Sequence, residues 1–449
     1  MPADASPQQL RALDAAHVWH PFTQMDRWLA DEQLVIDRAE GVWLVDADGR
    51  RYLDGNASLW VNVHGHRHPA LDAALHAQVD RLSHTTYLGL ANTPATLLAE
   101  QLVHRAPGRL AKVFFSEAGA AAVEVAIKMA YAYWLFSDQP QRSLFVSVDG
   151  AYHGDTVGSV SVGHMDAFHA TYAPLLFTTA AVPQPHCYRC PLGLTHPSCE
   201  LACAEALEEV LTREGDRVAA VVVEPRVQGA AGIITAPDGH LRRIADIARD
   251  HGVLLVVDEV ATGFGRTGPL FSCEAEGVEP DLMAIGKGLT GGYLPMSATL
   301  ATPEVFAAFA GRTFFHGHSY SGNPLAAAVA LANLELFEAE GTLGRAADLA
   351  THLAVELERF AAHPHVCDIR QRGTMVGIEL VADRSTREAF PEQQRIGDAV
   401  CRAAREHGLI IRPLGDVIVV MPALTMTAEE ATMLLDRLWA GLVDVLGVA

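Results

Sequence analysis

Two residues of this chain have the types and positions needed for covalent chemistry on a carbonyl group. Lys287 stands between two glycines directly after an apolar run, and Asp258 directly follows the apolar run 253–257. A lysine next to buried strand residues loses hydration, which lowers its pKa and frees the amine as a nucleophile. Such an amine can condense with a carbonyl, and a nearby carboxylate can keep a ring nitrogen protonated. The alternative is an ordinary surface lysine in a glycine-rich turn.

Residues 263–268 spell G-F-G-R-T-G, which matches the glycine spacing of a dinucleotide-binding loop. That loop must open a helix directly after a strand, so that the phosphates meet the helix N-terminus. Here Asp258 and Glu259 follow the strand and would repel a pyrophosphate, and Pro269 blocks a helix that begins at the last glycine. The sequence therefore argues against a nucleotide-binding loop.

Other apolar runs end in equally marked residues. These ends are Ser116-Glu117-Ala118-Gly119, Tyr152-His153-Gly154-Asp155 and Glu224-Pro225. In an open α/β sheet, ligands bind outside the carboxyl ends of the strands. We therefore expect these groups to converge on one cleft together with Asp258 and Lys287.

The elements that must position these residues follow from the periodicity of the apolar residues. From about residue 71, short apolar runs alternate with helical patterns, which predicts a mostly parallel sheet covered by helices on both faces. Residues 35–62 alternate in short pieces around a turn at 46–49, which predicts a small antiparallel unit. The tail mixes helices with the strand-like segments TMVGIELVAD and LIIRPLGDVIVVMP. We expect an α/β fold with a large domain at 71–325, a small N-terminal unit at 1–70 and a smaller α+β domain at 326–449.

Composition restricts the partners of the protein. The chain has 449 residues, and 33 Lys and Arg against 54 Asp and Glu give a net charge of −21. This excess of negative charge argues against nucleic acid as a partner. The N-terminal segment lacks the pattern of a secretory signal, and no apolar run is long enough to span a bilayer. We expect a cytoplasmic protein that binds small molecules and no membrane.

Two clusters have residue types that bind metals. One is a C-x2-C-x8-C-x3-C pattern in a segment rich in proline and glycine, formed by Cys187, Cys190, Cys199 and Cys203. It predicts one structural metal, zinc in the first place, although free thiols in a loop are the alternative. The other is the run VHGHRHP with His64, His66 and His68. A glycine and a proline there indicate a turn into a helix, so we assign these histidines a structural role.

Five longer motifs carry a resemblance to a known family. They are AYHGDT (151–156), EPRVQGAAG (224–232), DEVATGFGRTG (258–268), IGKGLTGGYLP (285–295) and HGHSYSGNPLA (316–326). Together they resemble the class III, subgroup II, aminotransferases that use pyridoxal 5'-phosphate, and the similarity runs from about residue 17 to the C-terminus. The resemblance implies fold type I, with a large cofactor-binding domain and a smaller domain from both chain ends. In this family the G-x-G-x-x-G segment is a loop beyond the cofactor aspartate.

The resemblance also implies roles for individual residues. Lys287 is expected to hold the cofactor and to move the proton during transfer, Asp258 to pair with the ring nitrogen, and Tyr152 to stack on the ring, with Val260 on the other face. The phosphate is expected to lie at the N-terminus of the helix that begins at Gly119 and Ala120. The partner subunit of a homodimer is expected to add His318 and Ser319 to the same site.

Four further stretches suggest the substrate. AAHVWHPFTQM, SLWVNVHGH, LTGGYLPMSATLAT and IIRPLG resemble the branch of the family that aminates 8-amino-7-oxononanoate in biotin biosynthesis. This resemblance implies that Arg412 binds the substrate carboxylate as a bidentate fork. The expected lining of the substrate tunnel is Phe22, Leu59, Trp60, Tyr152 and Gly317.

The chain departs from the family pattern at two places. Residues 117–120 are Glu-Ala-Gly-Ala where many relatives have Asp-Ser-Gly-Ser, so a serine hydroxyl is missing from the phosphate site. Phe22 and Leu59 replace a tyrosine and a tryptophan that line the pocket in relatives that use adenosylmethionine. Leu59 offers no aromatic face to an adenine ring, so this pair predicts lysine rather than adenosylmethionine as the better amino donor.

Competing functions remain distinguishable. The nearest is another class III transaminase that acts on an ω-amino acid such as β-alanine, ornithine or 4-aminobutyrate, and an assay with 8-amino-7-oxononanoate separates the two. A nucleotide-dependent oxidoreductase would bind nicotinamide. A non-catalytic binding protein on the same fold would lack the lysine that this chain has at position 287.

Overall fold

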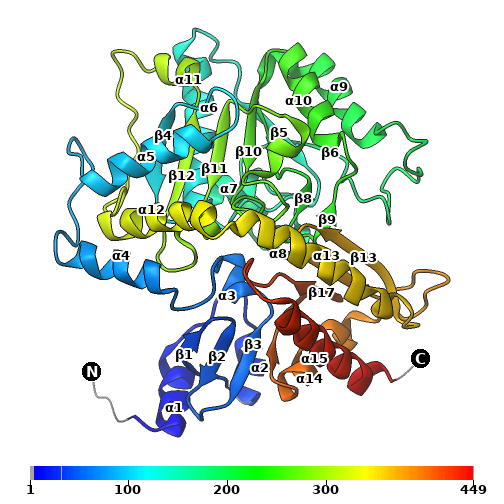
Figure 1. Ribbon diagram of the computed structural model, residues 1–449. Coiled ribbons are helices and arrows are strands. Elements are labelled where there is room, and N and C mark those ends of the chain that lie inside the picture. Colours follow the sequence, from blue (N-terminus) through cyan, green and yellow to red (C-terminus); the bar gives the residue numbers. More distant parts are fainter. Residues whose placement is uncertain (1–4, 32, 448–449) are drawn as a thin grey trace.

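The structure is a computed structural model that describes residues 5–31 and 33–447. Its larger body is built on a seven-stranded sheet (Figure 1). The strands, in spatial order, are β4 (Lys112–Ser116), β12 (Ser297–Ala301), β11 (Leu282–Ile285), β10 (Leu254–Asp258), β7 (Val218–Val223), β5 (Leu144–Val148) and β6 (Ala180–Val182). Only β12 runs antiparallel to its neighbours, so the predicted mostly parallel sheet is confirmed.

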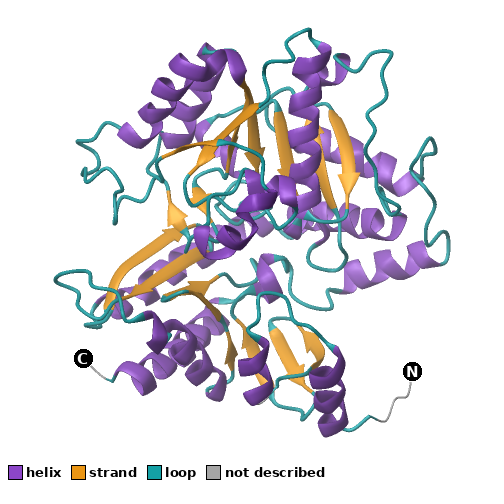
Figure 2. Cartoon of the chain, turned by 180° about the vertical axis from the view of Figure 1, so that it is seen from behind, coloured by secondary structure: helices purple, strands orange, loops and turns teal. Residues whose placement is uncertain are grey.

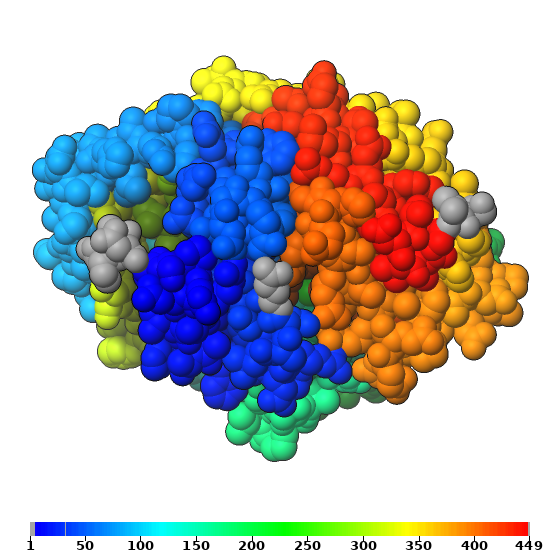
Figure 3. All heavy atoms as spheres, turned by 90° about the horizontal axis from the view of Figure 1, so that it is seen from below, coloured from blue at the N-terminus to red at the C-terminus, as the bar shows by residue number. Residues whose placement is uncertain are grey.

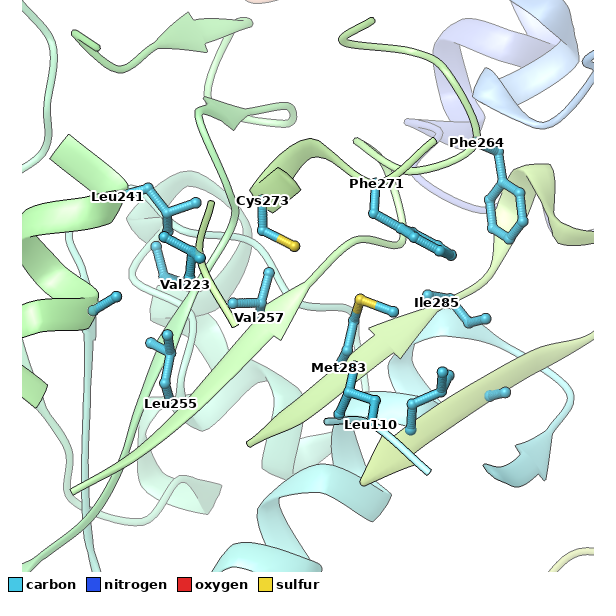
Figure 4. Close-up of a cluster of buried hydrophobic side chains, with 14 of the residues drawn as sticks. Leu110, Val223, Leu241, Leu255, Val257, Phe264, Phe271, Cys273, Met283 and Ile285 are labelled. Carbon is cyan, nitrogen blue, oxygen red and sulfur yellow. The ribbon is translucent and has the colours of Figure 1, made fainter. Parts of the chain in front are cut away.

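Helices cover both faces of this sheet, as the turned view in Figure 2 also shows. They are α4 (Pro69–Val79), α5 (Thr93–Arg105), α6 (Gly119–Phe136), α9 (Ala202–Glu214), α10 (His240–Asp250) and α12 (Pro324–Ala339). Side chains of a strand point alternately to the two faces. Leu254 and Val256 of β10 pack with residues of α6, whereas Leu255 and Val257 pack on the opposite face with Leu241 of α10 (Figure 4). This double burial explains the nearly continuous apolar runs of the sequence.

The smaller body joins the two ends of the chain. Strands β1 (Ile36–Glu40), β2 (Trp43–Asp46) and β3 (Arg51–Asp54) form the predicted antiparallel unit. β3 also pairs in parallel with β15 (Leu409–Ile410) from the far end of the sequence. Figure 3 shows the N-terminal segments in blue beside the C-terminal segments in orange and red.

A second sheet of the smaller body reaches toward the larger one. Its order is β13 (Val366–Arg372), β14 (Met375–Leu380), β17 (Val417–Val420) and β16 (Arg412–Leu414), and all its pairs are antiparallel. The helices α13 (Thr342–Ala361), α14 (Ile396–Glu406) and α15 (Ala428–Leu446) share one apolar core with this sheet and with Leu53 of β3.

Helix α12 (Pro324–Ala339) contains residue 326, where the sequence predicts the boundary between the two domains. Its buried residues Ala327, Ala330 and Leu334 belong to the apolar cluster of the large sheet. The core of the smaller body instead includes Leu349 and Leu353 of α13. We therefore propose that α12 is part of the large domain and that the small domain resumes in α13.

The remaining elements are short apart from α1. They are α1 (Pro7–His17), α2 (Met25–Ala30), α3 (Ala57–Trp60), α7 (Val157–Ser161), α8 (Asp166–His169), α11 (Pro303–Ala307), β8 (Val227–Gln228), β9 (Ile234–Thr235), and the 3-10 turns η1 (Ala170–Leu175), η2 (Gly215–Arg217), η3 (Ser272–Glu276), η4 (Lys287–Thr290) and η5 (Glu392–Gln394). Among the described residues, none of the helices combines the length and apolarity that a bilayer span requires.

Candidate active site

The carboxyl ends of neighbouring strands bring the marked residues together. Asp258 ends β10 and is in register with Ala284 of β11, three residues before Lys287. On the other side of β10, Val257 is in register with Val223 of β7, directly before Glu224. The convergence expected from the sequence is therefore present, because parallel strands end at the same edge of the sheet.

Lys287 is held in a special environment. Its backbone has φ +40°, a conformation that non-glycine residues rarely adopt, and its Nζ lies 5.4 Å from the centroid of the Trp60 ring. Burial lowers the pKa of its amine, and the charge of Arg266 lowers it further, against the opposing effect of Asp258 and Glu224. A lowered pKa makes the free base available, as a nucleophilic amine requires.

Asp258 is oriented by two hydrogen bonds. It is only 4% exposed, and its Oδ1 accepts the backbone N–H of Val260 at 3.0 Å. Its Oδ2 lies 2.7 Å from Nδ1 of the buried His153. Burial lowers the pKa of His153, but the hydrogen bond and charge of Asp258 outweigh burial and raise it overall. The role of His153 was not predicted from the sequence, although this residue lies in one of the strand-end motifs.

Glu224 is a second buried acid at the same edge of the sheet. Its carboxylate accepts the N–H of Tyr152 at 3.1 Å and that of Gly229 at 2.9 Å. Burial raises its pKa to about 7, and the charge of Asp258 adds to that rise, while His153 and the two N–H groups act in the opposite direction. Glu224 thus fixes the backbone of two loops that border the site.

The N-terminus of α6 forms a cradle without side chains. The N-cap residue Ala118 has no side chain that can accept a hydrogen bond from the helix. The first N–H groups of the helix have no partner within it. At Gly119 an added Cβ would stand 2.5 Å from Cγ1 of Val260, and at Gly154 it would stand 2.3 Å from Cβ of Ala120. Such close packing leaves backbone donors as the binding groups, which suits a phosphate.

Aromatic side chains form one wall near Tyr152. The Tyr152 hydroxyl donates to Asp155 at 2.7 Å. Phe168 of α8 lies edge-on to both Tyr152 and Phe22, with centroid distances of 6.1 and 5.4 Å. Phe168 was not identified from the sequence, because a lone phenylalanine in a short helix has no distinguishing pattern. It supplies an aromatic face that Leu59 does not.

The other expected substrate residues lie on two segments that touch. Leu59 and Trp60 belong to α3, and Leu59 is 51% exposed. Arg412 begins β16 with an exposed side chain, for which we find no ion pair within residues 5–31 and 33–447. The backbone N–H of Arg412 donates to Asn56 Oδ1, directly before α3, at 2.8 Å.

The segment with Gly317, His318 and Ser319 runs along the outside of the larger body. Gly317 stands against Leu88, and His318 contacts Glu117 beside the cradle of α6. Ser319 is exposed. Phe315 and Leu88 are 88% and 68% exposed, so apolar surface surrounds this segment.

The structure does not support the expected zinc site in the cysteine segment. Its four cysteines line one small cavity, but no three of their sulfur atoms lie within 4.8 Å of one another. All four are free, and burial raises the pKa of the Cys203 thiol to about 11. The segment is ordered by docking instead: Tyr188 donates to Cys367 at 2.6 Å and Arg189 to Glu379 at 2.7 Å.

A second group of potential metal ligands has two carboxylates that bind an arginine. Within the described residues, only His186, Asp368 and Glu379 approach one another closely enough for an ion. Arg370 already donates to both carboxylates, at 2.7 and 2.5 Å, so their charges are compensated. Two histidines of VHGHRHP have acidic partners: His66 lies 3.0 Å from Asp54 and His68 lies 3.0 Å from Glu340, while His64 is buried.

The G-F-G-R-T-G segment forms a loop and does not begin an α-helix. Phe264 fills the core, while Gly265 and Gly268 turn the chain at φ +83° and +119°. Arg266 is 2% exposed and donates to the carbonyl of Asn62 at 2.8 Å and to that of Pro422. The loop thus joins three distant parts of the chain beside the site.

This fold and site define the class of protein. Residues 25–442 match the family model described as Aminotransferase class-III, so the chain belongs to that family and is an aminotransferase. The resemblance inferred from the five motifs is confirmed. The family also implies pyridoxal phosphate as the cofactor.

Particular relatives narrow the comparison. The adenosylmethionine-8-amino-7-oxononanoate aminotransferase of Geobacter sulfurreducens is 48% identical, over 99% of each chain. The crystal structure of the enzyme of that name from Methanocaldococcus jannaschii is similar at a TM-score of 0.93 and 39% identity, covering 98% of this chain and 99% of the other. An (S)-enantioselective omega-transaminase from Thermomicrobium roseum is similar at a TM-score of 0.94 and 39% identity, with the same coverage.

Proposed function

We propose that the protein transfers an amino group to 8-amino-7-oxononanoate in biotin biosynthesis. Three relatives that each match at least 97% of this chain carry this activity in their names. The geometric observation that supports the chemistry is the amine of Lys287, with its lowered pKa, beside the oriented carboxylate of Asp258. A ping-pong reaction with a small amino donor fits this single site.

The residues present fit pyridoxal phosphate. We assign Lys287 to hold the aldehyde carbon and later to move a proton at the reacting carbon of the substrate. Asp258, fixed by His153, holds the proton on the ring nitrogen. Tyr152 and Val260 would flank the ring, and the N-terminus of α6 would hold the phosphate at Gly119 and Ala120. When bound, the cofactor supplies an electron sink for amino transfer.

The exposed guanidinium of Arg412 is the proposed partner of the substrate carboxylate. It has no ion pair among the described residues, and its planar fork matches a carboxylate with two hydrogen bonds. The apolar side chains of Leu59 and Trp60 would suit the methylene chain of 8-amino-7-oxononanoate. We place Phe22, Tyr152 and Gly317 on the remaining walls.

The amino donor is the finer part of this proposal. Leu59 in place of an aromatic residue favours lysine, whose methylene stem needs only an apolar wall. The names of the relatives and the aromatic face of Phe168 favour adenosylmethionine. Measuring the transfer rate with each donor at equal concentration decides between them. Faster transfer from adenosylmethionine rejects the prediction, based on Phe22 and Leu59, that lysine is the better donor.

We also propose that the active unit is a homodimer in the cytoplasm. Apolar side chains with high exposure surround the segment that carries His318 and Ser319, and buried interfaces cover such surfaces. In the dimer, these two residues would reach the phosphate site of the partner, and His318 would exchange its contact with Glu117 of its own chain for that site. They would add hydroxyl and imidazole donors that Ala118 and Ala120 cannot provide.

One assay tests the function. The purified protein, loaded with pyridoxal phosphate, is incubated with 8-amino-7-oxononanoate and each donor, and the diamino product is measured by mass spectrometry. We expect product with at least one donor. Turnover of β-alanine, ornithine or 4-aminobutyrate without any diamino product would instead favour an ω-amino acid transaminase, which the likeness to the omega-transaminase from Thermomicrobium roseum keeps as the second candidate.

A further inference from the structure

Asn56 is a buried amide that contacts the strand of Arg412. Its side chain lies between α3 and the sheet of the smaller body, and the residue is 2% exposed. Its Oδ1 accepts the backbone N–H of Arg412 at 2.8 Å, and its Nδ2 donates to the carbonyl of Val419 at 3.1 Å. Both polar ends of the carboxamide are therefore satisfied, as burial requires.

The two partners of Asn56 face each other across neighbouring strands. Arg412 of β16 is in register with Val419 of β17. A carboxamide carries an acceptor and a donor at fixed spacing, so one side chain can bond an N–H on one strand and a C=O on the next. Asn56 thereby fixes the backbone from which the guanidinium of Arg412 extends.

On its other side, Asn56 leads into a segment that is tightly constrained. Ala57, Ser58 and Trp60 have φ of +45°, +62° and +65°, values that are costly for residues other than glycine. Asp54 holds this conformation by accepting the N–H of Ser58 at 2.7 Å. The segment ends with the Trp60 ring 5.4 Å from Nζ of Lys287.

We propose that Asn56 is a positioning residue that sets the place of Arg412 relative to Lys287 and so selects substrates with a carboxylate at the correct distance. Trp60, whose ring lies near Lys287, follows Asn56 by four positions in the chain. This inference rests on the proposed function, in which Arg412 binds a carboxylate while Lys287 acts at the far end of the same substrate.

Removal of the amide is expected to leave the fold in place. The adjacent Gly55 is held independently, because its N–H donates to Ile410 and its carbonyl accepts the N–H of Met421, each at 2.9 Å. In Asn56→Ala these bonds remain, and the N–H of Arg412 loses its acceptor. Asn56→Gln keeps both an amide acceptor and an amide donor, on a side chain one methylene longer and without a charge, and serves as the conservative variant.

The test compares 8-amino-7-oxononanoate with its methyl ester, which has the same chain without the negative charge. We expect the wild-type protein to have a higher kcat/KM for the acid than for the ester. In Asn56→Ala the ratio of the two kcat/KM values should fall about tenfold, which corresponds to the loss of one hydrogen bond. The fall should come mainly from a higher KM for the acid. Asn56→Gln should keep more of the preference than Asn56→Ala does. Gln371→Ala is the matched control, because Gln371 also bonds two backbone carbonyls of the smaller body, at 2.7 and 3.0 Å, but does not contact Arg412.

The outcomes separate the inference from the function on which it rests. An unchanged acid preference in Asn56→Ala, or equal losses for acid and ester, overturns the positioning role, since a merely structural residue would affect both substrates alike. No product from the wild-type protein rejects the proposed function alone. In that case the same variants are compared with an amino acid donor and its methyl ester, and the reaction is followed by the loss of the visible absorption of bound pyridoxal phosphate. An unchanged preference for the free acid in Asn56→Ala, or equal losses for acid and ester, again overturns the positioning role.

Discussion

Lys287 and Asp258 define the chemistry at the scale of single residues. We expect Lys287→Ala to lose the visible absorption of covalently held pyridoxal phosphate and essentially all turnover, because the amine at this strand end is the proposed attachment point. Lys128→Ala, on the exposed side of α6, is the control and should keep both properties. Normal absorption and rates in Lys287→Ala would refute the assignment of the cofactor lysine.

Glu259 offers a pH-dependent test at the same scale. It is buried, accepts bonds from Thr262 and Cys273 at 2.5 and 2.8 Å, and burial raises its pKa to about 7 from 4.5. The folded protein thus keeps a proton that the unfolded chain releases, so this stabilisation is complete below pH 4.5 and is lost as the pH rises through 7.

The variant Glu259→Gln should therefore flatten the decline of thermal stability with pH in that range. The largest change in slope for one proton is about 1.4 kcal/mol per pH unit, and Glu224 retains its own contribution in the same direction. Melting temperatures measured across this range test the expectation, with the exposed Glu209→Gln as control. Identical slopes in wild type and Glu259→Gln would show that Glu259 does not carry the proton.

At the scale of elements, the start of α6 determines how the phosphate is held. Gly119→Ala would place a Cβ 2.5 Å from Val260 Cγ1, and such overpacking costs about 1 to 3 kcal/mol. We expect pyridoxal phosphate to bind roughly tenfold to a hundredfold more weakly to this variant, measured by titration of its absorption. Because Val260 is also proposed to flank the ring, Val260→Ala alone is the reference: Gly119→Ala should weaken binding less in that background than in the wild type. Equal losses in the two backgrounds would mean that the cradle is not limited by this contact.

The cysteine segment gives a second prediction at this scale. Because it is ordered by docking on β13 and β14, we expect a metal chelator to leave the melting temperature unchanged. Arg189→Ala should lower the melting temperature, because the hydrogen bond to Glu379 is lost. A hydrogen bond to a charged group contributes about 1.5 to 3 kcal/mol of stability, and this one contributes less because solvent screens the 37% exposed Arg189 side chain. One zinc per chain in elemental analysis, with destabilisation by chelator, would reverse this assignment.

At the scale of the whole molecule, the exposed apolar surface around Phe315 predicts association. We expect the protein to sediment as a dimer, and Phe315→Asp to shift it toward monomer with a loss of activity, because His318 and Ser319 would no longer reach a partner site. Val355→Asp, at an exposed valine of α13, is the control. A fully active monomer would contradict the shared site.

The sequence by itself determined the sheet, the strand-end motifs and the roles expected of Lys287 and Asp258, because the periodicity of buried strands and the ends of parallel strands are local features. It did not indicate that α12 packs with the large sheet, that His153 orients Asp258, or that Phe168 faces Phe22. It also favoured a zinc site where docking onto β13 and β14 orders the segment. These outcomes depend on contacts between residues far apart in the chain, such as Asn56 with Arg412. Only the tertiary structure decides those contacts, because local spacing does not specify which distant surfaces will bury each other.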